Sequence, residues 1–422
     1  MKDTRLPEGR LTRLARMASL GARTGASLLL SDTGETAAKQ ALEVLGSLRG
    51  LAAKVGQMAS YVDGVVPDAH RDAYETALRG LRAAAPTSSP EESRRTVETE
   101  LHAPISELFA TWEERPFASA SIGQVHRATL RDGREVAVKV QHAGIDGAVE
   151  SDLRNAGSLE GMVSTFAPRE LQSRRTFDEI AARFREELDY TLEARHTAEF
   201  AALHAGDPQV HVPVVVAERS ARRVITTELV RGMSFDEAAA RSPEERRVWA
   251  ETLWRFVFRG TLVGEVFNAD PHPGNYIFHE GGRVTFLDFG CVQRLEHEHV
   301  QHARDVHLAS LRRDEQGYRE ALRVMLSLRG GAWEDFTTGY VRQCFEPLFA
   351  SPYRITRDWV AALTRAATQA KPHMLRKDQG FVPMKPGMAL MNRLQFGFYS
   401  VLARLDVEAD YAGVERGFLD AP

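Results

Sequence analysis

A two-lobed α+β fold is predicted for this 422-residue chain by three features of its sequence. Two alternating segments, 124–130 and 135–141, flank the dipeptide Asp132-Gly133, which favours a tight hairpin turn. Two short strand-like segments, 276–278 and 284–287, follow in the C-terminal half. Helical periodicity dominates the rest of the chain. We therefore expect a small lobe with a mixed β-sheet, a mainly helical lobe, and a helical N-terminal extension.

The extension is predicted from helical patterns that precede the hairpin. Residues 10–30 form an arginine-rich amphipathic stretch, and apolar residues recur at helical spacing over 35–62. A Pro- and Ser-containing run at 85–90 has the composition of a linker. We assign 1–115 to the extension, 116–230 to the small lobe and 231–422 to the helical lobe.

The middle of the chain alternates between helical and extended patterns. Helices are expected over 147–204 and 243–264, with strands at 211–217 and 223–229 between them. The last of these strands leads into Val230-Arg231-Gly232, which we expect to be the hinge after the small lobe.

Composition narrows the class of protein. The net charge of −4 gives no reason to expect nucleic-acid binding. The two cysteines lack C-x-x-C spacing, so neither a disulfide framework nor a zinc site is indicated, and a cytoplasmic compartment is expected. Arginines interrupt the N-terminal segment, which therefore lacks the apolar core of a signal peptide. They also interrupt the apolar runs 253–266 and 388–405, which are predicted to be core helices rather than membrane spans.

Lysine is scarce in this chain. Between residues 40 and 370 only Lys54 and Lys139 occur, against a background in which arginine supplies the positive charge. A lysine in such an arginine-rich background indicates a position where a compact ammonium group suits the surroundings better than a planar guanidinium.

The strongest signal for chemistry lies in Asp270-Pro-His-Pro-Gly-Asn275 and the later Asp288-Phe289-Gly290. Asp270 and Asn275 stand five residues apart, as the catalytic Asp and metal-binding Asn of a protein-kinase catalytic loop do. A D-F-G triplet follows after a short hairpin in those enzymes. One carboxylate can orient or deprotonate a phosphate acceptor, while an amide oxygen and a second carboxylate hold Mg²⁺ against the phosphates.

Two upstream segments complete this pattern. Val136-Ala137-Val138-Lys139 matches the kinase strand whose lysine reaches the α- and β-phosphates. The loop before the hairpin has a single glycine where kinases have three, which makes it stiffer. The residues of this loop and strand that we expect around the nucleotide are Ala118, Ser119, Ala120, Ser121, Ile122, Gly123, Val125 and Ala137. Glu228 and Val230 are expected at the adenine-binding edge.

Together these motifs resemble the UbiB-like (AarF/ADCK) atypical kinase family, from about residue 10 to about residue 300. The resemblance rests on the alanine-rich loop 118–125, on Lys54-Val-Gly-Gln57, on Glu187-Leu-Asp189-Tyr190 and on the 270–275 motif. It implies a protein-kinase-like fold that uses ATP and Mg²⁺. It also implies chemistry that supports isoprenoid-quinone lipids of the ubiquinone type.

The resemblance also implies roles for particular residues. Lys54 and Gln57 point into the nucleotide pocket, where Glu187 and Asp189 meet Lys54. Lys139 pairs with Glu193, Asp270 is the base or acceptor-orienting residue, and Asn275 and Asp288 bind the metal. From spacing alone, Glu187, Asp189 and Glu193 cannot share one helix face. The alternative that remains is a solvated acidic helix start, with Glu186 and Glu187 near its N-terminus.

Three alternatives to an active atypical kinase or ATPase remain open. They are an ATP-binding scaffold, a lipid-binding module with little phosphotransfer, and a conventional protein kinase, which the missing glycines disfavour. Residues 1–30 carry six basic and two acidic side chains, a local charge of +4. We expect this segment to touch the inner face of a membrane peripherally, unless it packs on an acidic lobe instead.

Overall fold

The computed structural model describes residues 88–119, 122–147, 149–150, 182, 185–370, 382 and 388–419. The predicted helices at 10–30 and 35–62 lie outside these residues. The described chain divides into two compact units, which we treat separately. The first holds residues 88–127 and 139–188, and the second holds 128–138 and 189–419.

The first unit begins with helix α5 (Pro90–Leu101), whose start is fixed by a capping box. The Ser89 side chain accepts a hydrogen bond from the Glu92 amide, and the Glu92 carboxylate accepts one from the Ser89 amide. Pro90 occupies the first helical turn, where its missing N–H costs nothing. The predicted linker at 85–90 is therefore wrong at its end, because Pro90 already belongs to a helix.

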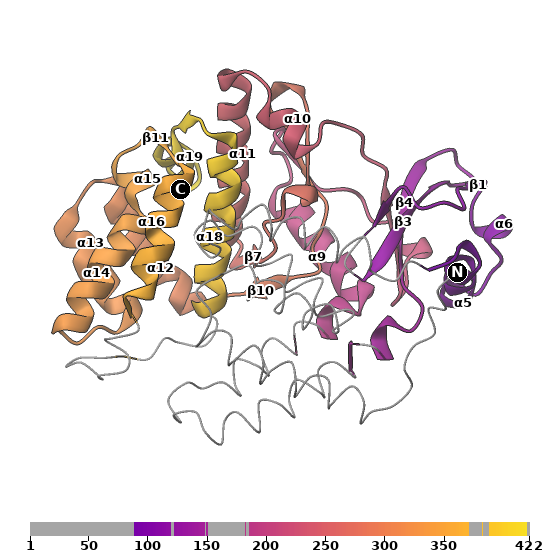
Figure 1. Cartoon of the computed structure of the whole chain (residues 1–422), viewed down its shortest axis with the longest axis horizontal. Helices are drawn as coiled ribbons and strands as arrows, with labels where there is room; N and C mark the ends of the chain where they lie inside the picture. The colour runs from indigo at the N-terminus through magenta and orange to yellow at the C-terminus, as the bar shows by residue number, and fades with distance from the viewer. Residues whose placement is uncertain are drawn as a thin grey trace, which may run out of the picture. The chain divides into compact units, whose positions relative to one another are not determined.

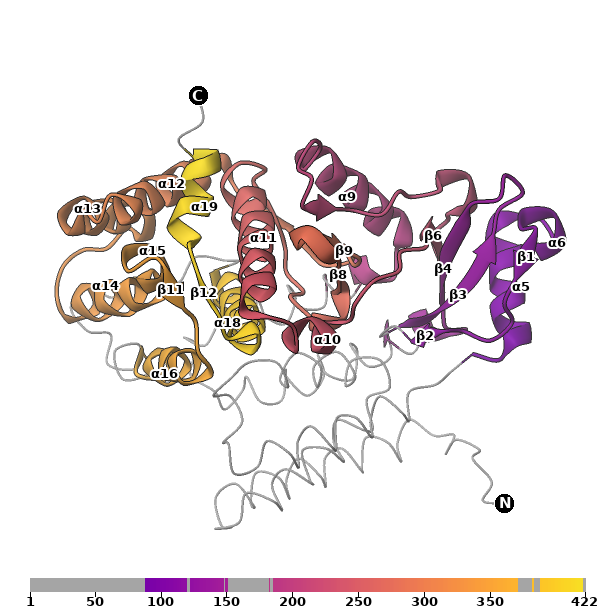
Figure 2. The same ribbon diagram turned by 90° about the horizontal axis from the view of Figure 1, so that it is seen from above.

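A small antiparallel sheet follows α5 and the short helix α6 (Ile105–Leu108). Its strand order is β1-β3-β4-β6, with β2 also paired to β3. The predicted hairpin is confirmed, with Gly133 at a φ of 88° in its turn. Gln124 of β3 donates a hydrogen bond of 2.7 Å to Ser93 of α5, and the helix lies beside this strand in Figure 2. The strand bounds are Thr111–Trp112 (β1), Ala118–Ser119 (β2), Gly123–Thr129 (β3), Glu135–Gln141 (β4) and Val224–Glu228 (β6).

The second unit carries two further small sheets around the predicted catalytic motifs. Strand β9 (Val284–Phe286) pairs with β8 (Tyr276–Phe278) in antiparallel fashion and with β5 (Val210–His211) in parallel. Strand β7 (Val266–Asn268) pairs with β10 (Val292–Arg294). The strands expected at 276–278 and 284–287 are thus confirmed to within a residue.

One expected strand of this unit was wrong in its extent. The strand predicted at 211–217 ends at His211, because Pro213 has no N–H to offer a ladder. The helices expected over 147–204 agree with most of the described residues in that range, with a break at Leu188 and Asp189. Helix α9 (Tyr190–Leu203) starts anew there, with the Asp189 side chain as its N-cap.

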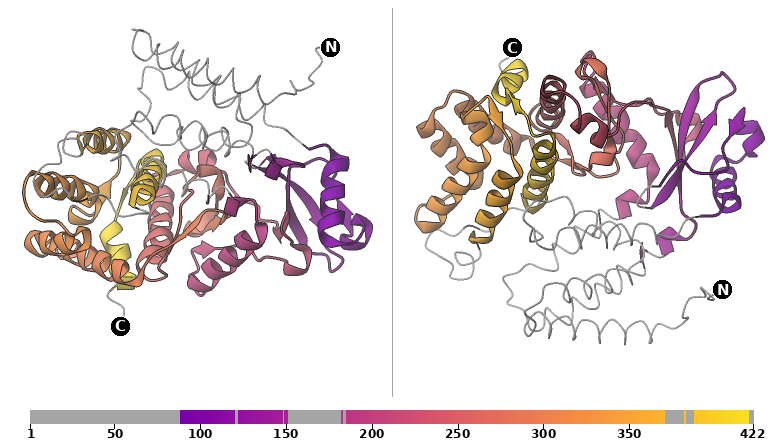
Figure 3. Two further views of the ribbon diagram at one scale, coloured as in Figure 1. Left: turned by 90° about the horizontal axis from the view of Figure 1, so that it is seen from below. Right: turned by 45° about the horizontal axis from the view of Figure 1, so that its top comes forward.

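Helices make up most of the remaining chain. In Figures 1 and 3, α12, α13, α14 and α16 lie side by side, with α18 and α11 next to them. The expected core helix at 388–405 is confirmed as α18, whereas the one at 253–266 ends at Leu262. The bounds are Phe235–Ala239 (α10), Pro243–Leu262 (α11), His297–Leu311 (α12), Glu315–Leu326 (α13), Ala332–Cys344 (α14), Glu346–Phe349 (α15), Arg357–Thr368 (α16), Met388–Leu405 (α18) and Tyr411–Leu419 (α19), with strands β11 (Tyr353–Arg354) and β12 (Glu408–Ala409).

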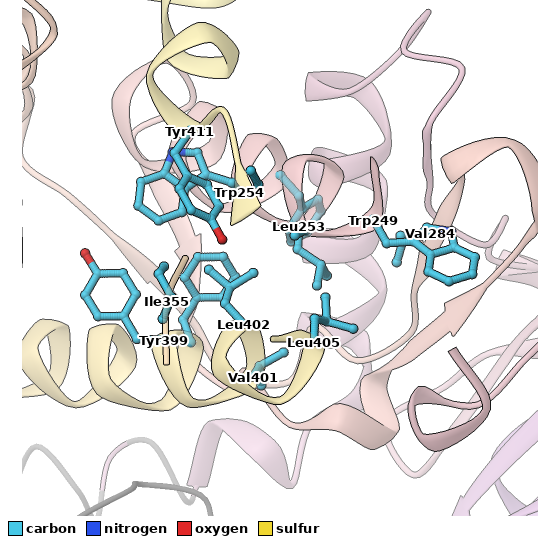
Figure 4. Close-up of a cluster of buried hydrophobic side chains, with 14 of the residues drawn as sticks. Trp249, Leu253, Trp254, Val284, Ile355, Tyr399, Val401, Leu402, Leu405 and Tyr411 are labelled. Carbon is cyan, nitrogen blue, oxygen red and sulfur yellow. The ribbon is translucent and has the colours of Figure 1, made fainter. Parts of the chain in front are cut away.

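The core of the second unit is centred on Trp254 of α11. Its ring lies 4.4 Å from that of Tyr411, centroid to centroid, and Leu402 of α18 is buried in the same cluster (Figure 4). The Trp254 indole donates to Glu415, whose other oxygen lies 2.7 Å from Nδ1 of His307. This buried carboxylate joins α11, α12 and α19, because each partner comes from a different helix. Within the described residues, no helix is long and apolar enough to cross a membrane.

Candidate functional site

The predicted catalytic loop is held by hydrogen bonds between its own residues. It leaves β7, passes Asp270 and forms a single helical turn, Pro273–Asn275. The His272 ring accepts a hydrogen bond at Nδ1 from the Gly274 amide, over 2.9 Å. Asn275 donates from Nδ2 to the backbone oxygen of Asp270, over 3.1 Å. Asp270 and Asn275, which sequence spacing had linked, are thus brought together by the backbone of one short loop.

The D-F-G triplet has an equally local geometry. Oδ1 of Asp288 accepts a hydrogen bond of 2.9 Å from the Gly290 amide. Phe289 is fully buried, with its ring centroid 4.9 Å from that of Phe200 on α9. The buried phenyl ring anchors the triplet, while the Asp288 side chain stays half-buried.

Asn268 connects these two segments, although the sequence analysis gave it no role. Its Nδ2 donates to the backbone oxygen of Asp288 over 2.5 Å, and its Oδ1 accepts from the Asp270 amide over 3.1 Å. One side-chain amide therefore fixes the spacing between the predicted base and the predicted metal ligand. Two features of the sequence could have indicated this role. Asn268 lies two residues before Asp270, and an asparagine side chain carries both a hydrogen-bond donor and an acceptor.

Glu193 of α9 reaches the same region. Its side chain is buried, and Oε2 lies 3.6 Å from the point that a Cβ on Gly290 would occupy. Oδ1 of Asp288 lies 3.2 Å from that point. Both carboxylates therefore flank Gly290, where a side chain would crowd them. His196, one turn further along α9, lies with Nδ1 3.2 Å from the Phe289 backbone oxygen. Since a carbonyl only accepts, this nitrogen carries the proton.

Lys139 stands on β4 between Val138 and Val140, both of which are fully buried. Its own side chain is half-buried, as expected for a lysine that leaves the core-facing side of the strand. Ala137 is half-buried on the same strand. Lys139 belongs to the first unit and Glu193 to the second, so their predicted pairing stays a prediction.

The alanine-rich segment 118–125 contributes β2 and the start of β3, which pair in antiparallel fashion. Ala118 and Ser119 form β2 and are exposed, and Ala118 pairs with Val125 of β3. Ile122 and Gly123 are buried at the start of β3. Ala120 and Ser121 lie outside the described residues, as do Lys54 and Gln57.

The two acidic residues predicted to meet Lys54 have different surroundings. Glu187 is buried, at 9% exposure, in the first unit. Oδ1 of Asp189 accepts hydrogen bonds from the Thr191 amide (2.9 Å) and hydroxyl (2.6 Å) at the start of α9. Capping of α9 is therefore one role of Asp189.

The predicted adenine-binding edge follows β6. The Glu228 amide donates to the Val214 backbone oxygen over 2.9 Å, so this N–H is already used within the protein. The Glu228 carboxylate lies 3.4 Å from Nε2 of His211. Val230 is half-buried beyond the strand end.

The chemistry of these groups fits magnesium. Because Nδ2 of Asn275 is used by the Asp270 carbonyl, its amide oxygen faces the other way, and Asp288 adds a carboxylate. Mg²⁺ prefers such oxygen ligands and is typically held by one or two protein groups together with phosphates and water. Tyr276 follows Asn275 in the chain. Its burial, together with the nearby negative charge of Asp270, raises the pKa of its hydroxyl group. In the described part of the chain, no group of three or more His, Cys, Asp or Glu side chains could hold a metal ion.

A small antiparallel sheet, a helical C-terminal region and a D-x4-N loop beside D-F-G define a kinase-like protein. Comparison with known proteins gives the family. Residues 80–322 match the model of the ABC1 atypical kinase-like domain, and the chain belongs to that family. This confirms the UbiB-like resemblance, which covers the same group of atypical kinases.

Similar proteins agree with this assignment. The chain is 28% identical to atypical kinase COQ8B, mitochondrial, of Rattus norvegicus, over 96% of this chain and 79% of that protein. It is 33% identical to protein ACTIVITY OF BC1 COMPLEX KINASE 7, chloroplastic, of Arabidopsis thaliana, over 58% of this chain and only 35% of that one. A solved chain from the complex of Rv3197 with erythromycin, from Mycobacterium tuberculosis, is 27% identical, with a TM-score of 0.64 over 94% of this chain and 97% of that one.

Proposed function

We propose that this protein binds ATP with Mg²⁺ and hydrolyses it or transfers its γ-phosphate to an acceptor. The observation that carries the proposal is the bridge formed by Asn268, which holds the backbones of Asp270 and Asp288 through a single amide. Phosphoryl transfer depends mainly on positioning and electrostatic stabilisation, so fixed spacing between these groups is what the reaction requires.

Each residue has a role in this proposal. Asp270 orients the attacking hydroxyl or water and takes up its proton. Asn275 and Asp288 supply oxygen ligands to Mg²⁺, which when bound neutralises charge on the phosphates. Lys139 holds the α- and β-phosphates and is itself held by Glu193. The loop 118–125 and the backbone at Glu228 and Val230 enclose the nucleotide.

The N-terminal extension is part of the proposal, although it lies outside the described residues. Lys54, with Gln57 beside it and Glu187 or Asp189 as counter-charge, is proposed to restrain the active site rather than to transfer phosphate. A buried ammonium needs such a partner, because an unpaired buried charge costs about 3–5 kcal/mol. Residues 1–30 are proposed to make peripheral contact with a membrane surface.

The proposed biological setting is support of isoprenoid-quinone lipid synthesis. It rests on the resemblance of the motifs and on the similarity to COQ8B. The acceptor would then be an isoprenoid or quinone-precursor lipid, unless ATP is simply hydrolysed. The second candidate function is an ATP-binding scaffold with little chemistry, and the retained Lys139, Asp270, Asn275 and Asp288 argue against it.

The deciding experiment compares three purified full-length proteins: the parent, Asp288→Asn and Asp305→Asn. Asp305 is exposed on α12 and serves as the matched control. At 100 to 1,000 times the dissociation constant, ATP or ADP with Mg²⁺ should stabilise the parent and the control by roughly 2–4 kcal/mol. Asp288→Asn should lose this stabilisation. Magnesium-dependent ATP turnover, with and without liposomes, then separates an enzyme from a scaffold.

A further inference from the structure

Helix α9 contacts the D-F-G segment along one face. Besides Glu193 and His196, which approach Gly290 and Phe289, the helix contributes Phe200, whose ring packs on that of Phe289. A fourth contact joins Glu199 of α9 to Arg294 of β10. Residues 193, 196, 199 and 200 recur at helical spacing and so lie on one side of the helix. The face that carries Glu193 is therefore the face that meets the segment 288–294.

The outermost contact is a two-pronged ion pair between α9 and β10. Nη1 of Arg294 donates to Oε1 of Glu199 over 2.8 Å, and Nη2 donates to Oε2 over 2.7 Å. Arg294 stands four residues after Gly290, at the end of the strand that pairs with β7. Through β7 the same strand adjoins Asn268, because Val292 is opposite Asn268 in the register.

Exposure shows what this pair can and cannot do. The Arg294 side chain is 65% exposed and that of Glu199 is 31% exposed. Ion pairs in such surroundings add little to the stability of the fold. Their two parallel hydrogen bonds nevertheless restrict the relative direction of the two groups, because a planar guanidinium makes both bonds only when its plane is aligned with the carboxylate. The pair is therefore suited to setting geometry rather than to holding the core together.

We propose that Arg294 and Glu199 are a positioning pair that sets how α9 lies on the D-F-G segment, and thereby where Glu193 stands relative to Asp288. This inference rests on the proposed function for its effect on turnover. Loss of the pair leaves α9 held by its buried contacts, among them Phe200 on Phe256 and Phe289, while the side of the helix at Glu199 can tilt. The Glu193 carboxylate then spends less time beside Gly290, and the predicted clamp on Lys139 weakens.

The test compares four variants of the full-length protein with the parent. Glu199→Gln and Arg294→Gln each remove one charge but keep a polar side chain. The double variant Glu199→Arg, Arg294→Glu reverses the pair and can form it again. Arg354→Gln is the matched control, because Arg354 also makes a two-pronged contact, from Nε and Nη2 to Asp406, elsewhere in the second unit, with a 56% exposed side chain.

Two measurements are made on each variant. Hydrogen exchange of the backbone amides of residues 190–203 reports how α9 is held, whether or not the protein hydrolyses ATP. Steady-state turnover of Mg-ATP reports the consequence for chemistry. We expect faster exchange in α9 for both single variants, and about a tenfold lower kcat with little change in KM, the size of effect seen for residues that bias a site without touching it. The reversed pair should recover both, and Arg354→Gln should match the parent in both.

Exchange in α9 that stays at the parent rate in both single variants would overturn the inference. So would a reversed pair that behaves no better than the single variants, because the effect would then come from the individual side chains. If the parent neither binds nor turns over Mg-ATP, the proposed function fails, while the exchange data still decide whether the pair positions α9.

Discussion

Asn268 donates a hydrogen bond from its side-chain amide to the backbone oxygen of Asp288, 20 residues further along the chain. The same amide accepts from the backbone of Asp270. Two loops that each present a carboxylate are thereby joined by one small side chain. Alanine at this position would leave a partly buried carbonyl and a partly buried amide without this partner.

Asn268→Ala should accordingly cost stability and, above all, weaken the response to nucleotide. Leaving a buried polar group unpaired costs about 1–3 kcal/mol. Gln209→Ala is the control, because Gln209 also offers a half-buried amide, bonded to Arg255 over 2.6 Å, away from the site. We expect both variants to lower the urea midpoint, but only Asn268→Ala to lose most of the Mg-ADP stabilisation. Full stabilisation in that variant would show that the bridge does not organise the site.

Gly397 gives a second prediction, because it lies on α18, beyond the residues that match the family. A Cβ at this position would stand 2.9 Å from Cγ of Pro271, the residue after Asp270. Alanine in place of an exposed helical glycine ordinarily stabilises by about 1 kcal/mol. Gly339→Ala on α14, with open space around it, should show that gain. Gly397→Ala should not, and its ATP turnover should fall, with a larger fall for Gly397→Val. Equal stabilisation and unchanged turnover for Gly397→Ala would mean that α18 does not support the loop.

His204 predicts the acid sensitivity of the fold. Its ring is buried against Phe256, and among the described residues neither ring nitrogen has a hydrogen-bond partner. Burial, with the charge of Arg259 nearby, lowers the pKa of His204 to about 4. The unfolded chain, where the pKa is near 6.5, therefore binds the proton more readily.

The stability contributed by neutral His204 is complete above about pH 6.5 and is lost as the pH falls towards 4. A shift of this size corresponds to roughly 3 kcal/mol. His204→Phe keeps an aromatic ring against Phe256 and removes the titrating group. Urea unfolding between pH 4 and 7 should show a shallower loss for the variant, with the two curves diverging most at the acid end. Parallel curves would contradict the assignment.

The sequence by itself determined the class of this protein and most of its chemical groups. Asp270, Asn275 and Asp288 could be found because their spacing is a property of one short loop and one hairpin, and such local geometry is written in neighbouring residues. The hairpin at 124–141 was equally visible, because Asp132-Gly133 favours its turn. The prediction of a strand at 211–217 was wrong beyond His211, because Pro213 has no backbone N–H to donate to a neighbouring strand.

Only the tertiary structure decided how these groups are held. Glu199 and Arg294 are 95 residues apart, and His196 is 93 residues from Phe289, so no periodicity in the sequence links them. The start of α9 at Asp189 could not be located from the sequence either. An aspartate can serve as a helix cap or as a counter-charge, and its surroundings in the folded protein determine which role it has. Gly397 matters only because the chain folds back to place Pro271 against it. Contacts of this kind depend on which faces pack together, and that is settled by burial of the whole core rather than by any one segment.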